Sequence, residues 1–439
     1  MDRYKKKPMP TRRQFLASAA LAFSGRSRSR LAAADDVPVT GAADAALKPF
    51  DDLLTKFVAD NAVPGAAVAI TKNGKLVYTR GFGYADVEKK VAVEPNATFR
   101  IASVSKPITA VGVMQLVERG KIKLDDPALK YVKLKPFLAE GAKADERWQK
   151  VTIRQCLQHT GGWDRGKKGS FDPIAVPGRI TREMKLPGAP TPDDIVRYMM
   201  GLPLDFDPGE KYAYSNLGHL VLSRVMETVT GQKYEPWTKA NVLKPAGVAG
   251  MYLGRGLPEK RPKGEVRYYD SKKRMGTCLY PPKVGERVPL PDGAGNIEGY
   301  EAHGGWVASA IDLVRFAAAL DYGKKSPLLS AESIREMWSR PAARADASGK
   351  PKEVFYACGW NVRPVGETCK ANTWHSGLIP GTSTLLVRRW DGIDWAVLFN
   401  SEADADGKTL STLIDGPIHT AAAAVKQWPA TDLFDKFPA

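Results

Sequence analysis

The segments of this chain that are predicted to be strands fall at its two ends, and the predicted helices fall between them. Strand-like apolar runs occur at 66–70, 76–80, 354–363, 382–389 and 394–399. The first two flank Asn73-Gly74 and the last two flank Asp391-Gly392, and both dipeptides are strong hairpin signals. Two consecutive domains cannot be assembled from this order. We therefore expect the terminal segments to share one antiparallel sheet.

The middle of the chain shows the periodicity of amphipathic helices. Apolar residues recur at helical spacing near 50–58, and again at 108–118, 153–159, 192–200 and 217–230. Residues 253–300 are polar and rich in Pro and Gly, which predicts an irregular insertion, and a last helix is expected at about 407–427. The predicted fold is α+β, with helices flanking the sheet and a mostly helical lobe at about 107–300. The expected site is a cleft between them.

The formal net charge of +17 would suggest nucleic-acid binding if it were spread over the chain. Residues 1–34 hold nine basic side chains and one acidic side chain, so the remainder carries only +9. No stripe of Lys and Arg alternates with aromatic residues there, and we expect no nucleic-acid partner. No apolar run reaches the roughly 18–20 residues needed to span a bilayer, so no transmembrane segment is expected either.

Residues 1–34 resemble an export signal. The run TRRQFL (11–16) contains Arg12 and Arg13 in the pattern of the twin-arginine motif, and a short apolar stretch follows at 15–23. A small-residue run at 32–34 precedes Asp35. We therefore expect an exported protein that is periplasmic or extracytoplasmic. Proteins that carry such signals cross the membrane already folded, so export alone does not predict disulfides.

Ser103 and Lys106 lie three residues apart at the start of the first helix in the middle of the chain. Residues at this spacing share one helical face, so the hydroxyl and the amine can touch. A partly desolvated lysine can lose its proton and activate a serine oxygen. The pattern is weak alone, because about one Ser-x-x-Lys is expected by chance in a chain of this length. The same Ser-x-x-Lys pattern would also occur at the start of a helix whose lysine is merely exposed to solvent.

Two further short segments indicate a function only in combination with Ser103 and Lys106. Tyr214 and Asn216 follow a Pro-Gly turn and precede a helix, where the phenol could relay a proton and the amide could orient Lys106 or a substrate. The triplet at 375–377 (HSG) falls on a predicted strand edge, where Gly377 would let a substrate backbone approach closely.

In this order the three elements resemble the serine β-lactamase and penicillin-binding-protein superfamily. The resemblance is closest to its class C-like branch, which includes family VIII carboxylesterases, D-aminopeptidases and D-alanyl-D-alanine carboxypeptidases. It extends over about 44–425 and predicts one hydrolase domain at 42–430. The supporting segments are VTIR (151–154), HTGG (159–162), DPG (207–209), YSNLG (214–218), GGWVAS (304–309) and HSGLIPG (375–381).

The resemblance implies a role for each residue. Ser103 would be the acylated nucleophile, Lys106 its base, and Tyr214 the group that passes the proton to the leaving group and later activates water. Asn216 and the segment of His375, Ser376, Gly377 and Leu378 would bind the substrate. The main-chain N–H groups of Ser103 and Leu378 would form the oxyanion hole.

Departures from the family pattern limit the expected substrate. Antibiotic-hydrolysing members have Lys-Thr-Gly where this chain has HSG, and His375 is mostly neutral at pH 7 if its pKa is unperturbed. This weakens the case for β-lactams and for peptides with a free carboxylate. Leu378 is bulkier than the residue often found there and would narrow the acyl pocket.

We therefore expect a serine hydrolase that forms an acyl-enzyme with small ester or amide substrates. The alternatives are a peptidase for D-amino-acid or cell-wall peptides, a weak β-lactamase, and a non-catalytic binding module of the same fold. The sequence does not indicate the oligomeric state.

No metal and no cofactor is expected, because neither the histidines nor the four cysteines have ligand spacing. His159 is expected to fix a loop, and Cys156 to lie in the core. Cys358 and Cys369 fall on expected neighbouring strands, which leaves a disulfide between them open.

The insertion at 253–300 is rich in basic residues, which include Lys260, Arg261, Lys263, Arg267, Lys272, Lys273 and Arg274. A solvated loop is one explanation. The other is that these side chains border the cleft and favour anionic substrates or the cell-wall polymer.

Overall fold

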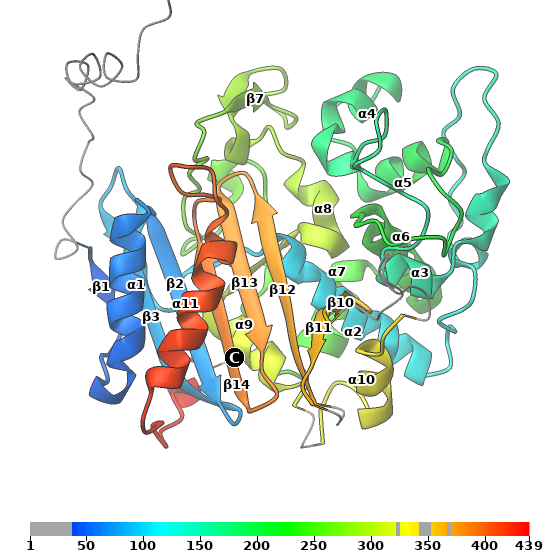
Figure 1. Cartoon of the computed structure of the whole chain (residues 1–439). Helices are drawn as coiled ribbons and strands as arrows, with labels where there is room; N and C mark the ends of the chain where they lie inside the picture. The colour runs from blue at the N-terminus through cyan, green and yellow to red at the C-terminus, as the bar shows by residue number, and fades with distance from the viewer. Residues whose placement is uncertain (1–36, 322–324, 342–352, 367–369, 439) are drawn as a thin grey trace, which may run out of the picture.

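The computed structural model describes residues 37–321, 325–341, 353–366 and 370–438. Within these residues the centre of the molecule is a nine-stranded antiparallel sheet (Figure 1). Its order is β1-β3-β2-β14-β13-β12-β11-β10, and β4 pairs with β3. The bounds are β1 Val39–Thr40, β2 Gly65–Lys72, β3 Lys75–Asp86, β4 Val91–Ala92, β10 Phe355–Tyr356, β11 Asn361–Pro364, β12 Ala371–Ile379, β13 Thr382–Arg388 and β14 Ile393–Phe399.

The two ends of the chain meet inside this sheet, as the order of elements predicted. β2 lies between β3 and β14, and its register pairs Val68 with Val397 and Ala69 with Ala396. Side chains on these strands alternate between two buried faces: Val68 and Val397 contribute to one hydrophobic cluster, and Ala69 and Ala396 to the other. A strand with period-two alternation presents each face to a different layer. The sheet is therefore the middle of three layers.

One outer layer consists of the first and the last helix. Figure 1 shows α1 (Lys48–Asp60) and α11 (Leu410–Ala424) over the same face of the sheet. Phe57 of α1 stacks on Phe399 of β14, with 5.5 Å between the ring centroids. Pro49 stands in the first turn of α1, where its missing N–H costs no helical hydrogen bond.

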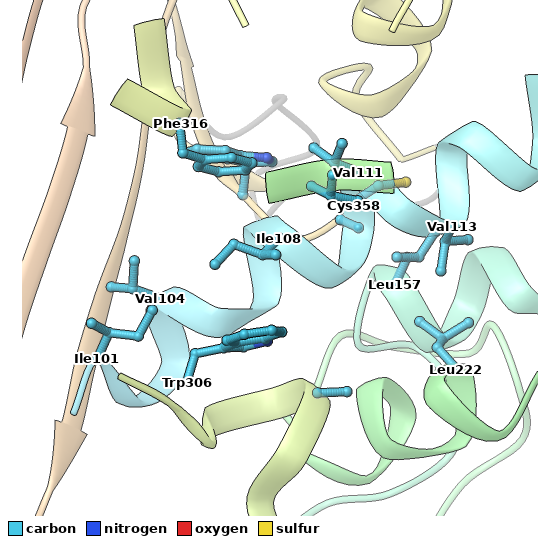
Figure 2. Packing of buried hydrophobic residues seen from close by; sticks show 14 of the residues in the cluster. Ile101, Val104, Ile108, Val111, Val113, Leu157, Leu222, Trp306, Phe316 and Cys358 are labelled. Carbon is cyan, nitrogen blue, oxygen red and sulfur yellow. The ribbon is translucent and has the colours of Figure 1, made fainter. Parts of the chain in front are cut away.

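The other layer is the predicted helical lobe together with α9. Its elements are η3 Ala102–Val104, α2 Ser105–Glu118, α3 Ile153–Leu157, α4 Pro177–Glu183, α5 Pro192–Met200, α6 Leu217–Thr230, α7 Tyr234–Thr238, α8 Ile297–Gly304, α9 Ala310–Ala318 and α10 Ala331–Met337. α2 is buried from Ser105 to Leu116, which is the state of a helix with neighbours on all sides. Figure 2 shows Val104, Ile108 and Trp306 in the packing around its first turns.

Two predictions about secondary structure need correction. The run 354–363 is not one strand: β10 and β11 form a tight hairpin, in which Gly359 has a φ of 79°. Gly359 is required there, because a Cβ would lie 2.6 Å from the Cβ of Ala110 on α2. The segment 253–300 also contains more regular structure than expected, since β7 (Met275–Thr277) pairs with β8 (Arg287–Pro289) and α8 begins at Ile297.

A separate small sheet lies beside the site, with the order β5-β9-β6. Its strands are β5 Thr98–Arg100, β9 Trp306–Ser309 and β6 Tyr252–Leu253. β5 leads directly into η3, and β9 follows α8. Among the described residues, none of the helices combines the length and the apolar character that crossing a membrane requires.

Candidate active site

Ser103 lies in a short turn between a strand and a buried helix. η3 carries it from β5 into α2, and its side chain lines a cavity of about 350 Å³. The preceding Ala102 has a φ of 47°, which lies in the left-handed region that residues with a side chain rarely adopt. Such a backbone conformation persists only where the surroundings fix it, and it is common at active sites. The turn exposes the Ser103 hydroxyl, whereas Ala102 and Val104 are buried.

Lys106 is fully buried and has three polar partners. Its Nζ donates to Ser103 Oγ at 3.0 Å, to Asn216 Oδ1 at 2.7 Å and to the main-chain oxygen of His303 at 2.8 Å. Burial lowers the pKa of Lys106 well below its ordinary value, and the carboxylate of Asp172 only partly opposes this effect. The site thus favours a neutral amine next to the serine hydroxyl.

Tyr214 is the second side chain that contacts Ser103. Its hydroxyl donates to Ser103 Oγ at 2.9 Å, although the two residues are more than a hundred positions apart. The Tyr214 ring lies 4.3 Å from the ring of His159, between centroids, and the Arg165 guanidinium carbon lies 4.8 Å from its centroid. Burial raises the pKa of Tyr214 above its ordinary value, and Arg165 lowers it by a smaller amount. The phenol is therefore a proton donor in this state.

Asn216 connects Lys106 to a carboxylate that the sequence analysis missed. Its Nδ2 donates to Asp172 Oδ2 at 2.8 Å, so its Oδ1 faces Lys106. Asp172 is buried and caps a short 3-10 helix through the N–H of Ile174. In the sequence, Asp172 precedes a proline and signals only a turn. No motif connects it with the site.

The third acceptor for Lys106 depends on a kink in α8. Glu301 has a φ of 35° and a ψ of −109°, and the chain then presents the oxygen of His303 to Lys106. The carboxylate of Glu301 pairs with Arg224 of α6, which is also nearly buried. An ion pair between α6 and α8 thus fixes the strained turn behind Lys106.

His375 lies on β12 with both ring nitrogens occupied. Nδ1 lies 2.7 Å from the main-chain oxygen of Ser376, and Nε2 lies 3.0 Å from the hydroxyl of Tyr356. Burial lowers the pKa of His375 to about 3, and the nearby Lys106 acts in the same direction. The ring is therefore neutral at physiological pH and provides no cation for a substrate. Ser376 and Leu378 line the cavity, and the Leu378 side chain is half exposed at its edge.

The explanation offered for Gly377 is wrong. We expected its missing side chain to admit a substrate backbone. A Cβ at this position would instead lie 2.2 Å from the main-chain oxygen of Ile101 and 2.2 Å from Thr384 Oγ1. Gly377 is buried and does not line the cavity. Its missing side chain therefore leaves room for the turn that carries Ser103.

The cavity combines aromatic, apolar and polar side chains. Its lining consists of Ala102, Ser103, Arg165, Ile174, Tyr212, Tyr214, Asn216, Tyr300, His303, Gly304, Tyr356, Asn361, His375, Ser376, Leu378 and Ile379. Arg165 is the one charged side chain among these lining residues of the described chain. Sequence analysis did not single out Arg165, because it stands in a loop without a motif.

The basic residues of 253–300 lie elsewhere. None of them lines this cavity as far as the structure describes the chain, and several have acidic partners. Arg261 pairs with Asp292 at 2.7 Å, and Arg274 pairs with Asp270 at 2.5 Å.

The remaining histidines and cysteines do not form a metal site in the described residues, where no group of three or more potential ligands occurs. His159 Nδ1 accepts from the N–H of Ser215 at 3.4 Å, in keeping with a role in fixing the loop. Cys156, Cys278 and Cys358 are buried free thiols. Cys369, the suggested partner of Cys358, and residues 1–34 lie outside the described residues.

Comparison with known proteins agrees with this geometry. A family model described as Beta-lactamase matches residues 50–415. The esterase EstB of Burkholderia gladioli is 30% identical over 335 residues, which are 75% of this chain and 78% of EstB. Protein flp of Staphylococcus aureus (strain COL) is 32% identical over 184 residues, or 42% of this chain and 33% of that protein. The chain thus aligns with about a third of the length of that relative.

A solved structure shows the same fold at lower identity. The D-amino acid amidase from Ochrobactrum anthropi SV3, complexed with L-phenylalanine, superposes with a TM-score of 0.64 at 22% identity. The superposition covers 86% of this chain and 98% of that one. Because the family model covers most of the chain and EstB aligns with 75% of it, the chain belongs to the beta-lactamase family.

Proposed function

We propose that this protein hydrolyses esters or amides of small acyl substrates through an acyl-enzyme on Ser103. The observation that carries the proposal is the buried amine of Lys106 at 3.0 Å from Ser103 Oγ, with a pKa that burial lowers well below its ordinary value. In the neutral state its two N–H groups are occupied by Asn216 and His303. The lone pair then remains for the proton of the Ser103 hydroxyl.

The reaction would proceed in two stages. Ser103 Oγ attacks the carbonyl carbon of the substrate while its proton passes to Lys106 Nζ. The main-chain N–H groups of Ser103 and Leu378 would stabilise the oxyanion, a contribution typically of a few kcal/mol per donor. Tyr214 then gives its proton to the leaving oxygen or nitrogen and regains one from Lys106. In the second stage water, deprotonated by the same pair, releases the acid and restores Ser103.

Esters are the first substrates to test. EstB, which aligns with 75% of this chain, is named as an esterase. The 350 Å³ cavity suits a small acyl group, and the neutral His375 offers no charge for the substrate carboxylate that the Lys of Lys-Thr-Gly would hold.

A fluorophosphonate probe tests the nucleophile directly. Wild-type protein should gain one probe mass, and Ser103→Ala should gain none. The matched control is Ser105→Ala, which removes a neighbouring hydroxyl that is buried against the N–H of Trp306 and should leave labelling intact. Labelling of Ser103→Ala, or loss of labelling only in Ser105→Ala, would refute the assignment.

Export by the twin-arginine route is also proposed. The support is the TRRQFL run with its apolar stretch and small-residue segment in residues 1–34. Full-length protein should appear outside the cytoplasm of a host with that pathway, and replacing Arg12 and Arg13 by lysine should retain it inside. Equal distribution of the two forms would contradict the proposal.

A further inference from the structure

The cavity beside Ser103 contains one permanent positive charge. Burial lowers the pKa of Lys106 well below its ordinary value and that of His375 to about 3, which favours the uncharged form of both side chains. His303 also lines the cavity, and burial lowers its pKa well below the ordinary value. Arg165 is the remaining basic side chain of the described lining. Arg165 is thus the one cationic side chain among the lining residues that the structure describes.

Arg165 is placed for contact with a ligand. Half of its side chain is exposed, and its guanidinium stacks over the Tyr214 ring at 4.8 Å from the centroid. Arg165 Nη1 forms an ion pair at 3.7 Å with Asp172 Oδ2, which also accepts from Asn216 at 2.8 Å. The structure gives the Arg165 guanidinium no hydrogen bond to any residue that it describes, which leaves its N–H donors for solvent or substrate.

Hydrogen bonds and an ion pair fix the loop that carries Arg165. The N–H of Asp164 donates to Asp205 at 2.8 Å, and Ser170 Oγ donates to the same carboxylate at 2.7 Å. Lys211 pairs with Asp164 at 2.7 Å. These contacts fix the chain on both sides of Arg165, so ligand binding would not have to order the loop.

We propose that Arg165 binds a carboxylate of the substrate, so that the preferred esters or amides are monoanions. This inference rests on the proposed function at Ser103. A planar guanidinium matches a carboxylate with two parallel hydrogen bonds, and Arg165 is the one cationic side chain in the described lining. The position of Arg165 over Tyr214 places this charge within reach of a substrate attacked by Ser103. The exposed Tyr212 and Leu378 at the edge would contact the apolar part of the same substrate.

Two matched pairs of esters test the inference. The acyl-side pair is mono-(4-nitrophenyl) adipate and 4-nitrophenyl hexanoate; the leaving-group pair is 3-carboxyphenyl acetate and 3-carbamoylphenyl acetate. Rates are measured with wild type, Arg165→Gln, Arg165→Lys and Lys168→Gln, and Ser103→Ala gives the uncatalysed background. Lys168 is exposed on the same loop and does not line the cavity, so its variant controls for general surface charge.

In at least one pair, Arg165→Gln should lower kcat/KM for the charged ester about tenfold or more and change the neutral ester less than threefold. The kcat/KM of Arg165→Lys for the charged ester should lie between those of wild type and Arg165→Gln. The kcat/KM of Lys168→Gln should equal that of wild type. The pair that responds shows which side of the scissile bond carries the carboxylate.

Equal losses for charged and neutral esters would overturn the inference, because Arg165 would then act through Tyr214. No loss for any ester would overturn it as well. In both cases Ser103 would still take the fluorophosphonate probe, and the proposed function would stand. Absence of labelling together with no turnover of all four esters would overturn the proposed function, and this inference with it.

Discussion

At the scale of single residues, the chemistry of this site depends on which groups keep their protons. Burial lowers the pKa of Lys106 well below its ordinary value and raises the pKa of Tyr214 above its ordinary value. The amine can therefore accept a proton while the phenol can donate one. Groups with pKa values displaced in this way mark the acid and the base of an enzyme.

Lys106→Met should abolish acylation while preserving the fold. The variant keeps an unbranched side chain in the buried position but has no basic nitrogen to accept the Ser103 proton. Loss of a general base typically lowers rates by 10²–10⁴-fold, and fluorophosphonate labelling of Ser103 should slow by about this factor. Circular dichroism controls for folding. A labelling rate within tenfold of wild type would show that another group activates the serine.

Tyr214→Phe should discriminate between leaving groups. The variant retains the ring that packs on His159 and Arg165 and loses only the hydroxyl 2.9 Å from Ser103 Oγ. An alkoxide needs a proton to depart, whereas 4-nitrophenolate does not. The loss in kcat/KM should be about 10²-fold or more for an ethyl ester and much smaller for the corresponding 4-nitrophenyl ester. Equal losses would mean that Tyr214 has no role as the acid.

Part of this residue-level site could be predicted from the sequence, and part could not. Ser103, Lys106, Tyr214 and Asn216 occur in ordered short motifs, and the structure brings them together. Asp172 has no such motif, because its role depends on a loop that folds back onto Asn216. A contact of that kind is a property of tertiary structure, and single-sequence patterns do not encode it.

At the scale of elements, the position of the nucleophile is set by the packing of η3 and the preceding Ile101 against β12 and β13. Thr384 on the neighbouring strand β13 donates to the oxygen of Ile101 at 2.9 Å, and Gly377 leaves room for that oxygen. The sequence correctly indicated that Gly377 allows a close approach, but it suggested a substrate backbone where the structure has the main-chain oxygen of Ile101. Strand patterns show that a side chain is missing, and they do not show what occupies the space.

Gly377→Ala should therefore damage activity through the backbone. The added Cβ would meet a main-chain oxygen at 2.2 Å, so η3 must shift. Displacement by about 1 Å can cost roughly 10²-fold in rate, and we expect such a loss in kcat/KM. Gly416→Ala is the matched control, because nothing lies within 4 Å of a Cβ at that exposed position of α11. Wild-type kcat/KM in Gly377→Ala would show that η3 is not fixed in this way.

The strand β14 should make stability depend on pH. Burial raises the pKa of Asp394 to about 7, although Arg388 and a hydrogen bond from Thr71 lower it in part. The unfolded chain would have the ordinary value of about 3.9. Between these values the folded state holds a proton that the unfolded state does not, so stability decreases as pH rises from about 4 to 7 and is constant above.

Asp394→Asn should remove this decrease. The difference in melting temperature between variant and wild type should become more favourable to the variant from pH 5 to pH 8. The corresponding free energy is about 3 kcal/mol, from about 1.4 kcal/mol per pH unit over the interval from pH 5 to pH 7. Thermal melts at several pH values measure it. A difference that does not change with pH would mean that Asp394 is ionised in the folded protein throughout.

At the scale of the whole molecule, the chain closes on itself in the sheet. β2 from the N-terminal part pairs along its full length with β14, and η3 packs on β12 from the C-terminal part. This closure was predictable because strands at both ends need partners. The oxyanion groups proposed for Ser103 and Leu378 consequently come from opposite ends of the chain. Neither part can form the site alone.

A cut between Pro341 and Glu353 should leave a functional, non-covalent complex. A protease site inserted at 342–352, which lies between the described elements α10 and β10, allows cleavage after folding. The two pieces should elute together under native conditions and keep Ser103 labelling, because β2–β14 pairing and the core against α1 and α11 hold them. The piece 37–341 expressed alone should not be labelled, since it lacks β12 and leaves β2 without its partner. Wild-type labelling of that piece would show that the site does not need the C-terminal strands, and the closed sheet would then be a support for the fold rather than a requirement of the chemistry.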